Sequence, residues 1–229
     1  HFLLLSHNFD LMDHGFREYI GIMVAMLAMF RYPVNYYWPQ MLFTSTICSV
    51  LSYILSVEND IPSAPLIQII VLILCIWLMF YTPLLWSMVV CISFFIGYAV
   101  LQGGVIYLNF WFGLIPPVVD KTSIEIYLIQ IFCSAVCWIA GWYWQRKRIG
   151  FLFVPTNREV PFVWNRTGIW LFVGSVASFT TMWISYVLYT KTNFQWFAIL
   201  LSILFVVLVS LLIAMRIKNR EYVEKTGNH

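Results

Sequence analysis

Apolar residues occupy the chain in seven long segments, separated by short stretches that hold most of the charged residues and prolines. A helix needs roughly 20 mostly apolar residues to cross the hydrocarbon core of a bilayer. Runs such as LIQIIVLILCIWLMF do not alternate apolar and polar positions, which argues against spanning β-strands. The pattern predicts an all-α polytopic membrane bundle of about seven transmembrane helices near 14–30, 40–57, 64–81, 84–104, 123–144, 164–189 and 194–215.

The prolines support these boundaries. Proline lacks the backbone N–H that a helix interior requires. All nine prolines fall at or between the ends of the predicted helices, at positions 33, 39, 62, 65, 83, 116, 117, 155 and 161.

Composition agrees with a membrane protein. The chain of 229 residues is 62% hydrophobic and only 10% charged. Soluble domains are usually about 45–50% apolar and about 25% charged. We therefore expect one transmembrane domain over 1–229, in which 1–13 form an outer N-terminal extension, 14–215 the helical bundle and 216–229 a cytoplasmic tail.

The distribution of basic residues predicts the orientation, because short cytoplasmic loops carry an excess of Lys and Arg. With the N-terminus outside and the C-terminus inside, ten of the thirteen basic residues lie on the cytoplasmic side. They are Arg31, Arg146, Lys147, Arg148, Arg158, Arg166, Arg216, Lys218, Arg220 and Lys225.

The densest group of charges is the run Arg146, Lys147 and Arg148, directly after the aromatic stretch WYW at 142–144. We interpret it as the cytoplasmic end of the fifth span, where it also contacts anionic lipid headgroups. No further basic cluster joins it, so nucleic acid is not an expected partner.

The sequence offers little catalytic chemistry. The histidines, at positions 1, 7, 14 and 229, lie near the chain ends, and HExxH is absent. The cores of the second to seventh spans contain no ionisable residue, which argues against a pump or a proton-coupled transporter. The five cysteines are expected to pack as small apolar residues. We expect no enzymatic activity, no catalytic residue, no metal site and no cofactor.

Small residues form stripes on two spans. Ser45, Ser49, Ser52 and Ser56 are spaced by 4, 3 and 4 positions, which places them on one helical face. Such a face favours close helix packing, and the alternative is the polar wall of a ligand cavity. Gly174, Ser175 and Ser178 make a similar face on the sixth span, expected to be a packing or homodimer seam.

Amide side chains concentrate in the predicted outer half of the bundle, at Gln68, Gln102, Asn109, Gln130 and Gln195, accompanied by Tyr98, Tyr107, Trp111 and Tyr127. An apolar cleft with a few polar groups is a common form of ligand site. The pattern indicates either an interfacial belt or an outward-facing site. The ligand-binding candidates are Gln102, Gln130, Tyr107, Trp111 and Ser52.

Two helix ends are open questions. From Pro83 to Pro116 an unbroken helix would be about 48 Å long at 1.5 Å per residue, so we expect a break at Gly103–Gly104. A long tilted helix is the alternative. At the other end of the chain, the charged tail RIKNREYVEKTGNH can continue the last span as a helix, with Glu221 and Lys225 as an i,i+4 pair.

Stretches such as MFRYPVNYYWPQMLF and LFVVLVSLLIAMRIKNREYVEK resemble the membrane sensor region of Gram-positive peptide-pheromone histidine kinases of the accessory-gene-regulator type. The resemblance implies a bundle of six or seven spans whose last span runs into a cytoplasmic helix. The dimerisation histidine and ATP-binding domain of that family are missing. The companion processing protease needs a His/Cys pair in one region, which this chain lacks.

We therefore expect a non-enzymatic membrane sensor or receptor-like module, in the plasma membrane of a bacterium, that binds an apolar or peptidic ligand from the outer face. The alternatives are a substrate-binding or membrane subunit of a multi-component transporter, and a structural or assembly subunit. The expected partners are the lipid bilayer and a membrane or cytoplasmic protein or a second copy.

Overall fold

The structure, a computed structural model, describes residues 2–59, 63–113, 124–155, 166–189 and 194–227. Every regular element in these ranges is helical, so the predicted all-helical fold is confirmed, with one α-helix for each apolar segment. In chain order the elements are α1 (Phe2–Met29), α2 (Trp38–Ser52), the π-helix η1 (Tyr53–Glu58), α3 (Ala64–Met79), α4 (Leu84–Trp111), α5 (Ile124–Lys147), α6 (Arg166–Tyr189) and α7 (Phe194–Gly227).

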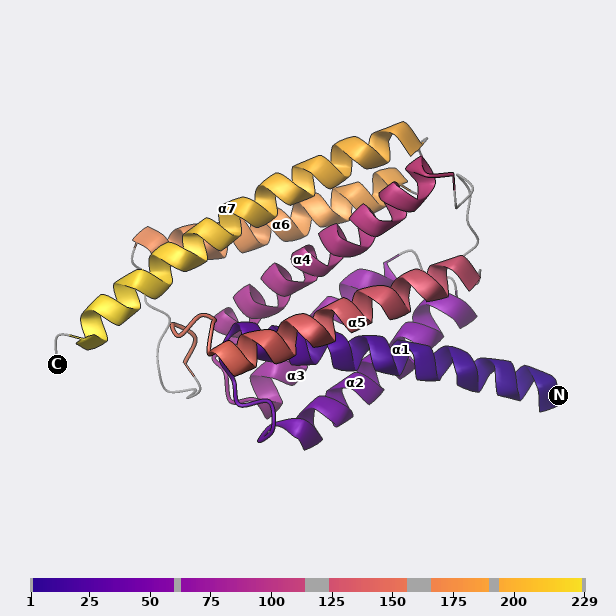
Figure 1. Cartoon of the computed structure of the whole chain (residues 1–229), viewed down its shortest axis with the longest axis horizontal. Helices are drawn as coiled ribbons and strands as arrows, with labels where there is room; N and C mark the ends of the chain where they lie inside the picture. Colours follow the sequence, from indigo (N-terminus) through magenta and orange to yellow (C-terminus); the bar gives the residue numbers. More distant parts are fainter. Residues whose placement is uncertain (1, 60–62, 114–123, 156–165, 190–193, 228–229) are drawn as a thin grey trace.

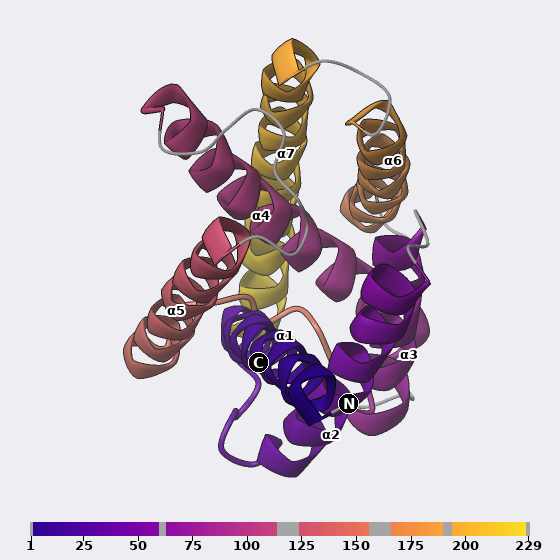
Figure 2. The same ribbon diagram turned by 90° about the vertical axis from the view of Figure 1, so that its right-hand side faces the viewer.

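The helices form an elongated bundle (Figure 1). α1 packs against α5 and α2, and α3 packs against α2 and α4. α4 also contacts both α6 and α7, so it joins the α6–α7 pair to the other helices (Figure 2). α4 is therefore the helix that connects the two parts of the bundle.

Glycines allow α1 and α5 to approach closely. A Cβ atom at Gly141 of α5 would lie 3.0 Å from the Cα of Ala25 on α1, and one at Gly21 would lie 2.6 Å from the Oγ of Ser134. Small residues permit such contact between helix backbones, which van der Waals packing then stabilises in a membrane.

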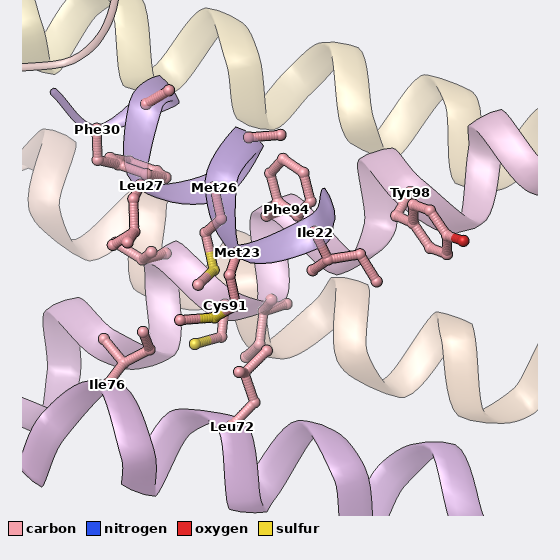
Figure 3. Close-up of a cluster of buried hydrophobic side chains, with 14 of the residues drawn as sticks. Ile22, Met23, Met26, Leu27, Phe30, Leu72, Ile76, Cys91, Phe94 and Tyr98 are labelled. Carbon is pink, nitrogen blue, oxygen red and sulfur yellow. The ribbon is translucent and has the colours of Figure 1, made fainter. Parts of the chain in front are cut away.

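The apolar core lies where α1, α3 and α4 meet (Figure 3). Met23 and Met26 of α1 are fully buried there, and Leu72 of α3 and Cys91 of α4 close the cluster from the other helices. Tyr98 lies at one edge of this core (Figure 3).

Three connecting segments, 30–37, 80–83 and 148–155, pack together at one end of the bundle. The Phe151 N–H donates to the Met29 carbonyl at 2.8 Å, and the hydroxyls of Tyr32 and Thr82 lie 2.7 Å apart. Burial raises the pKa of Tyr32 to about 12, against the opposing effect of its hydrogen bond with Thr82. Since this end also carries Arg31, Arg146, Lys147 and Arg148, we call it the basic end and the opposite one the far end.

The C-terminal part of α7 also reaches the basic end, where Asn219 Oδ1 accepts a 2.7 Å hydrogen bond from the Leu152 N–H. The helix runs without interruption to Gly227, so the predicted helical tail is confirmed. Lys225, the expected partner of Glu221, has a side chain outside the described residues. Glu221 instead accepts a hydrogen bond from Thr167 and lies 3.9 Å from the Nζ of Lys218.

α1 begins at Phe2, so residues 2–13, the predicted N-terminal extension, continue the helix of the predicted first span. One predicted boundary was wrong. α4 runs unbroken through Gly103–Gly104 to Trp111, so the expected break is absent and the alternative, one long helix, is correct. A break inside an apolar bundle leaves backbone groups without partners, and the Asn109 side chain adds a 2.8 Å bond to the Val105 carbonyl in this part of α4.

Three helical stretches are long and apolar enough to cross a membrane: Leu84–Trp111, Tyr127–Lys147 and Ala198–Glu224. Their outward surfaces are strongly apolar, as at Ile139 and Val206, which are 66% and 63% exposed. Exposed apolar surface on this scale is typical of a protein whose solvent is lipid.

Candidate functional site

A half-buried carboxylate lies between the helices of the bundle. Glu18 is on α1, and its Oε1 accepts a hydrogen bond from the hydroxyl of Tyr98 on α4. Tyr98 itself is buried. An acidic side chain within an apolar bundle is costly unless it has partners, so such groups generally mark ion, proton or ligand sites.

Neighbouring polar groups extend this site toward α2 and α3. The hydroxyl of Tyr19, next to Glu18 in the chain, donates to Gln68 Oε1 of α3 at 2.8 Å. Ser52, at the end of α2, lies close to the Tyr19 hydroxyl. Tyr19 and Gln68 are both buried. Four helices therefore place polar groups together at this point.

These groups share one depth. At 1.5 Å per residue, Glu18 lies about 17 Å from Met29, the end of α1, and Gln68 about 17 Å from Met79, the end of α3. Tyr98 lies about 21 Å from Leu84, the start of α4. All three helix ends are at the basic end, so these groups form a layer near the middle of the bundle. We call Glu18, Tyr19, Ser52, Gln68 and Tyr98 the polar layer.

The polar layer can bind a hydrogen-bond donor or a cation. Carboxylate and amide oxygens accept hydrogen bonds, and a phenol can both donate and accept. The described residues contain no group of three or more His, Cys, Asp or Glu side chains placed to hold a metal ion. The chemistry of this layer is therefore recognition through one carboxyl group and several other oxygen atoms.

Glu18 was missed by the sequence analysis. An N-terminal boundary near residue 14 placed it at the outer end of the first span, whereas α1 starts twelve residues earlier, at Phe2. The argument against proton coupling considered only the second to seventh spans, so it does not apply to Glu18. An available signal was the position of Glu18 itself, only two residues before the apolar run IGIMVAMLAMF.

The predicted ligand residues are divided between the layer and the far end. Ser52 belongs to the polar layer. Gln102 on α4 and Gln130 on α5 are half-buried. Gln102 lies one helical turn from Tyr98, the hydrogen-bond partner of Glu18, and Gln130 lies one turn from Ser134. Ser134 donates a 3.1 Å hydrogen bond to the carbonyl oxygen of Arg17.

The remaining two candidates lie farther along α4. Tyr107 is half-buried, and Trp111, at the last turn, is 71% exposed and packs edge-on against Phe112. Both residues therefore lie on α4 between Tyr98 and the far end, and their role in ligand binding stays a prediction.

The small-residue stripes lie at helix contacts within the chain. Ser45 and Ser49 are buried on α2, and a Cβ atom at Gly15 of α1 would meet the Ser49 Oγ at 3.0 Å. The side chain of Ser56 is outside the described residues. On α6, Ser175 and Ser178 are buried, and a Cβ atom at Gly174 would lie 3.2 Å from Leu211 of α7.

Two cavities open elsewhere on the described surface. One of about 440 Å³ follows the α6–α7 groove between Arg166 and Ser178. The other, of about 340 Å³, lies at the basic end between α1, α5 and the segment 34–38. Neither is lined by any of the five predicted ligand residues.

Comparison with known proteins gives no match to a family model, to a curated protein or to a solved structure.

Proposed function

We propose that this chain is a seven-span membrane protein with its N-terminus outside, and that it acts as a non-enzymatic sensor or receptor-like module. Three helices meet the requirements for spanning, and the other four lie beside them in the same bundle (Figure 1). In this orientation the basic end faces the cytoplasm, in keeping with the excess of Lys and Arg there.

The observation that carries the proposal is the hydrogen bond from Tyr98 to Glu18 near the middle of the bundle. A ligand can switch a receptor only if it binds one of the receptor's two states more tightly than the other. The Glu18 carboxylate supplies this difference, because a ligand cation or donor that reaches it replaces the tyrosine hydroxyl. Gln102 and Gln130 then stand one turn farther toward the outer face, on the route of entry.

The chemistry of the layer defines the ligand class. A single carboxylate within apolar walls favours an apolar or peptidic molecule that carries an amine or another strong hydrogen-bond donor. A peptide with a free N-terminus meets both conditions. The same layer disfavours anionic ligands, because Glu18 would repel them.

The test is intact-complex mass spectrometry of protein extracted from its native membrane. We expect a co-purifying small molecule or peptide on the wild-type protein and its loss from Glu18→Gln and from the Gln102→Ala, Gln130→Ala double variant. The matched control is Glu125→Gln, the same chemical change at the far end of α5. If Glu18→Gln and Glu125→Gln retained the co-purifying molecule equally, the polar layer would not be its binding site.

A second candidate function is a membrane subunit of a multi-component cation- or proton-coupled transporter, which a carboxylate between the helices of the bundle specifically favours. It predicts that the wild-type protein co-purifies with an ATPase or a second membrane subunit and that the polar layer is bare. Under this alternative Glu18→Gln abolishes transport by the assembled complex without changing its composition.

A further inference from the structure

A cavity at the basic end is lined by three tryptophans. Trp38, from the start of α2, and Trp138 and Trp142, from α5, surround a space of about 340 Å³. Two amide side chains, Asn35 and Gln145, complete its polar lining. The cavity combines an apolar interior with neutral hydrogen-bond donors, at the level of the bundle where α1 and α5 end.

One basic side chain lies against a wall of this cavity, and three further basic residues belong to the same end of the bundle. The guanidinium carbon of Arg146 lies 5.2 Å from the ring centroid of Trp142, one of the lining residues. Lys147 and Arg148 follow it in the chain, and the guanidinium of Arg31 donates to the Arg148 carbonyl. Arg31 and Arg148 thereby tie the end of α1 to the end of α5, and four positive charges gather at this end of the bundle.

The elements that build the cavity supply no negative charge to balance these cations. Residues 19–57 and 126–158 contain no Asp or Glu. The acidic groups described at the basic end are on α7, where Glu221 contacts Thr167 and Lys218 and Glu224 pairs with Arg220 at 3.4 Å. The positive field beside the tryptophans is therefore available to an anion.

The shape of the cavity selects among anionic partners. One turn of a helix, about 10 Å wide and 5.4 Å long, already occupies more than the available volume, so a partner helix does not fit. A soluble anion would use the cations and leave the tryptophan walls without a role. A lipid uses both, because basic residues attract its phosphate and tryptophan suits the membrane–water interface.

We propose that this cavity is a specific site for an anionic glycerophospholipid, with one acyl chain between the tryptophans and the phosphate at Arg146 and Lys147. The site bridges α1 and α5, the two helices that also hold Glu18 and Ser134. The proposal of a lipid site rests on the membrane location of the bundle and does not depend on a ligand at the polar layer.

The experiment measures binding of fluorescent phosphatidylglycerol and phosphatidylcholine to the purified full chain in detergent micelles. We expect the wild-type protein to prefer phosphatidylglycerol by about tenfold or more, since two basic side chains act on its phosphate. Arg146→Ala with Lys147→Ala should abolish this preference. The matched control, Arg166→Ala with Arg216→Ala, removes two cations from α6 and α7 and should preserve it.

Two further arms examine the apolar half of the site. Trp142→Leu should weaken phosphatidylglycerol binding several-fold, whereas Trp170→Leu, in the α6–α7 groove, should leave it unchanged. Excess inorganic phosphate should not displace the labelled lipid. The proposal is overturned if wild type binds both lipids equally, if the two double variants lose the preference equally, or if phosphate displaces the lipid.

Discussion

At the residue scale, the pairing of Glu18 with Tyr98 is a contact whose effect on stability can be measured. Replacing Tyr98 by Phe keeps the ring in the core and removes the donor of the hydrogen bond to Glu18. Leaving a buried acceptor without its partner costs about 1–3 kcal/mol. Tyr98→Phe should therefore lower the free energy of unfolding by about that amount, measured by thermal or denaturant unfolding in detergent.

The control for this prediction is Tyr143→Phe on α5, where the side chain is 48% exposed. Substitutions at exposed positions usually change stability by less than about 0.5 kcal/mol. Equal effects of the two variants would show that the Glu18 carboxylate gains nothing from the tyrosine, and the case for the polar layer would fail with it.

A second residue-scale prediction concerns the crossing of α1 and α5. A methyl group at Gly141 would meet the backbone of Ala25 at 3.0–3.1 Å, and backbone cannot move aside as a side chain can. Gly141→Ala should therefore destabilise the bundle by about 1–3 kcal/mol, the usual cost of overpacking. Gly97→Ala is the control, because its methyl group would lie 3.7 Å from Leu208. Differential scanning fluorimetry of both variants in one detergent decides the matter, and equal midpoints would contradict the close crossing.

At the element scale, hydropathy alone located every helix, because a bilayer-length apolar run has few alternatives to a helix. Its limits appear at the helix ends. The start of α1 at Phe2 was missed because residues 2–13 mix polar and apolar types, and α4 was expected to break because two glycines follow one another. The position of Glu18 depended on both the true length of α1 and its contact with α4, and no local pattern contains that contact.

The continuity of α4 leads to an element-scale prediction at Gly104, which has no neighbouring atom within 4 Å of an added Cβ. Since the position is inside a regular helix, Gly104→Ala should raise the free energy of unfolding by up to about 1 kcal/mol. Gly104→Pro should lower it by about 3 kcal/mol or more, because proline removes a helical hydrogen bond. Circular dichroism during thermal unfolding measures both. If both variants matched the wild-type midpoint, α4 would be broken at this glycine pair.

At the scale of the whole molecule, α4 makes one structure of two helix groups. α6 and α7 pack on α4, and α4 also contacts α3, α5 and α1. The polar layer is on one side of α4, and α7, which carries the helical tail, is on the other. A ligand that changes the Glu18–Tyr98 contact therefore acts on the one helix shared by both groups, which is the arrangement a sensor needs to pass a signal toward α7.

The orientation of the whole bundle can be measured because the five native cysteines, 48, 75, 91, 133 and 137, are all buried. Asn59, after η1, is exposed at the far end, and Tyr36, between α1 and α2, is 73% exposed at the basic end. With the N-terminus outside, a membrane-impermeant maleimide added to intact cells should label Asn59→Cys and should label Tyr36→Cys only after the cells are opened. The opposite result would invert the bundle and put Gln102 and Gln130 on the cytoplasmic side. Labelling of both positions in intact cells would mean that α2 does not cross the membrane, and the seven-span topology would then be wrong.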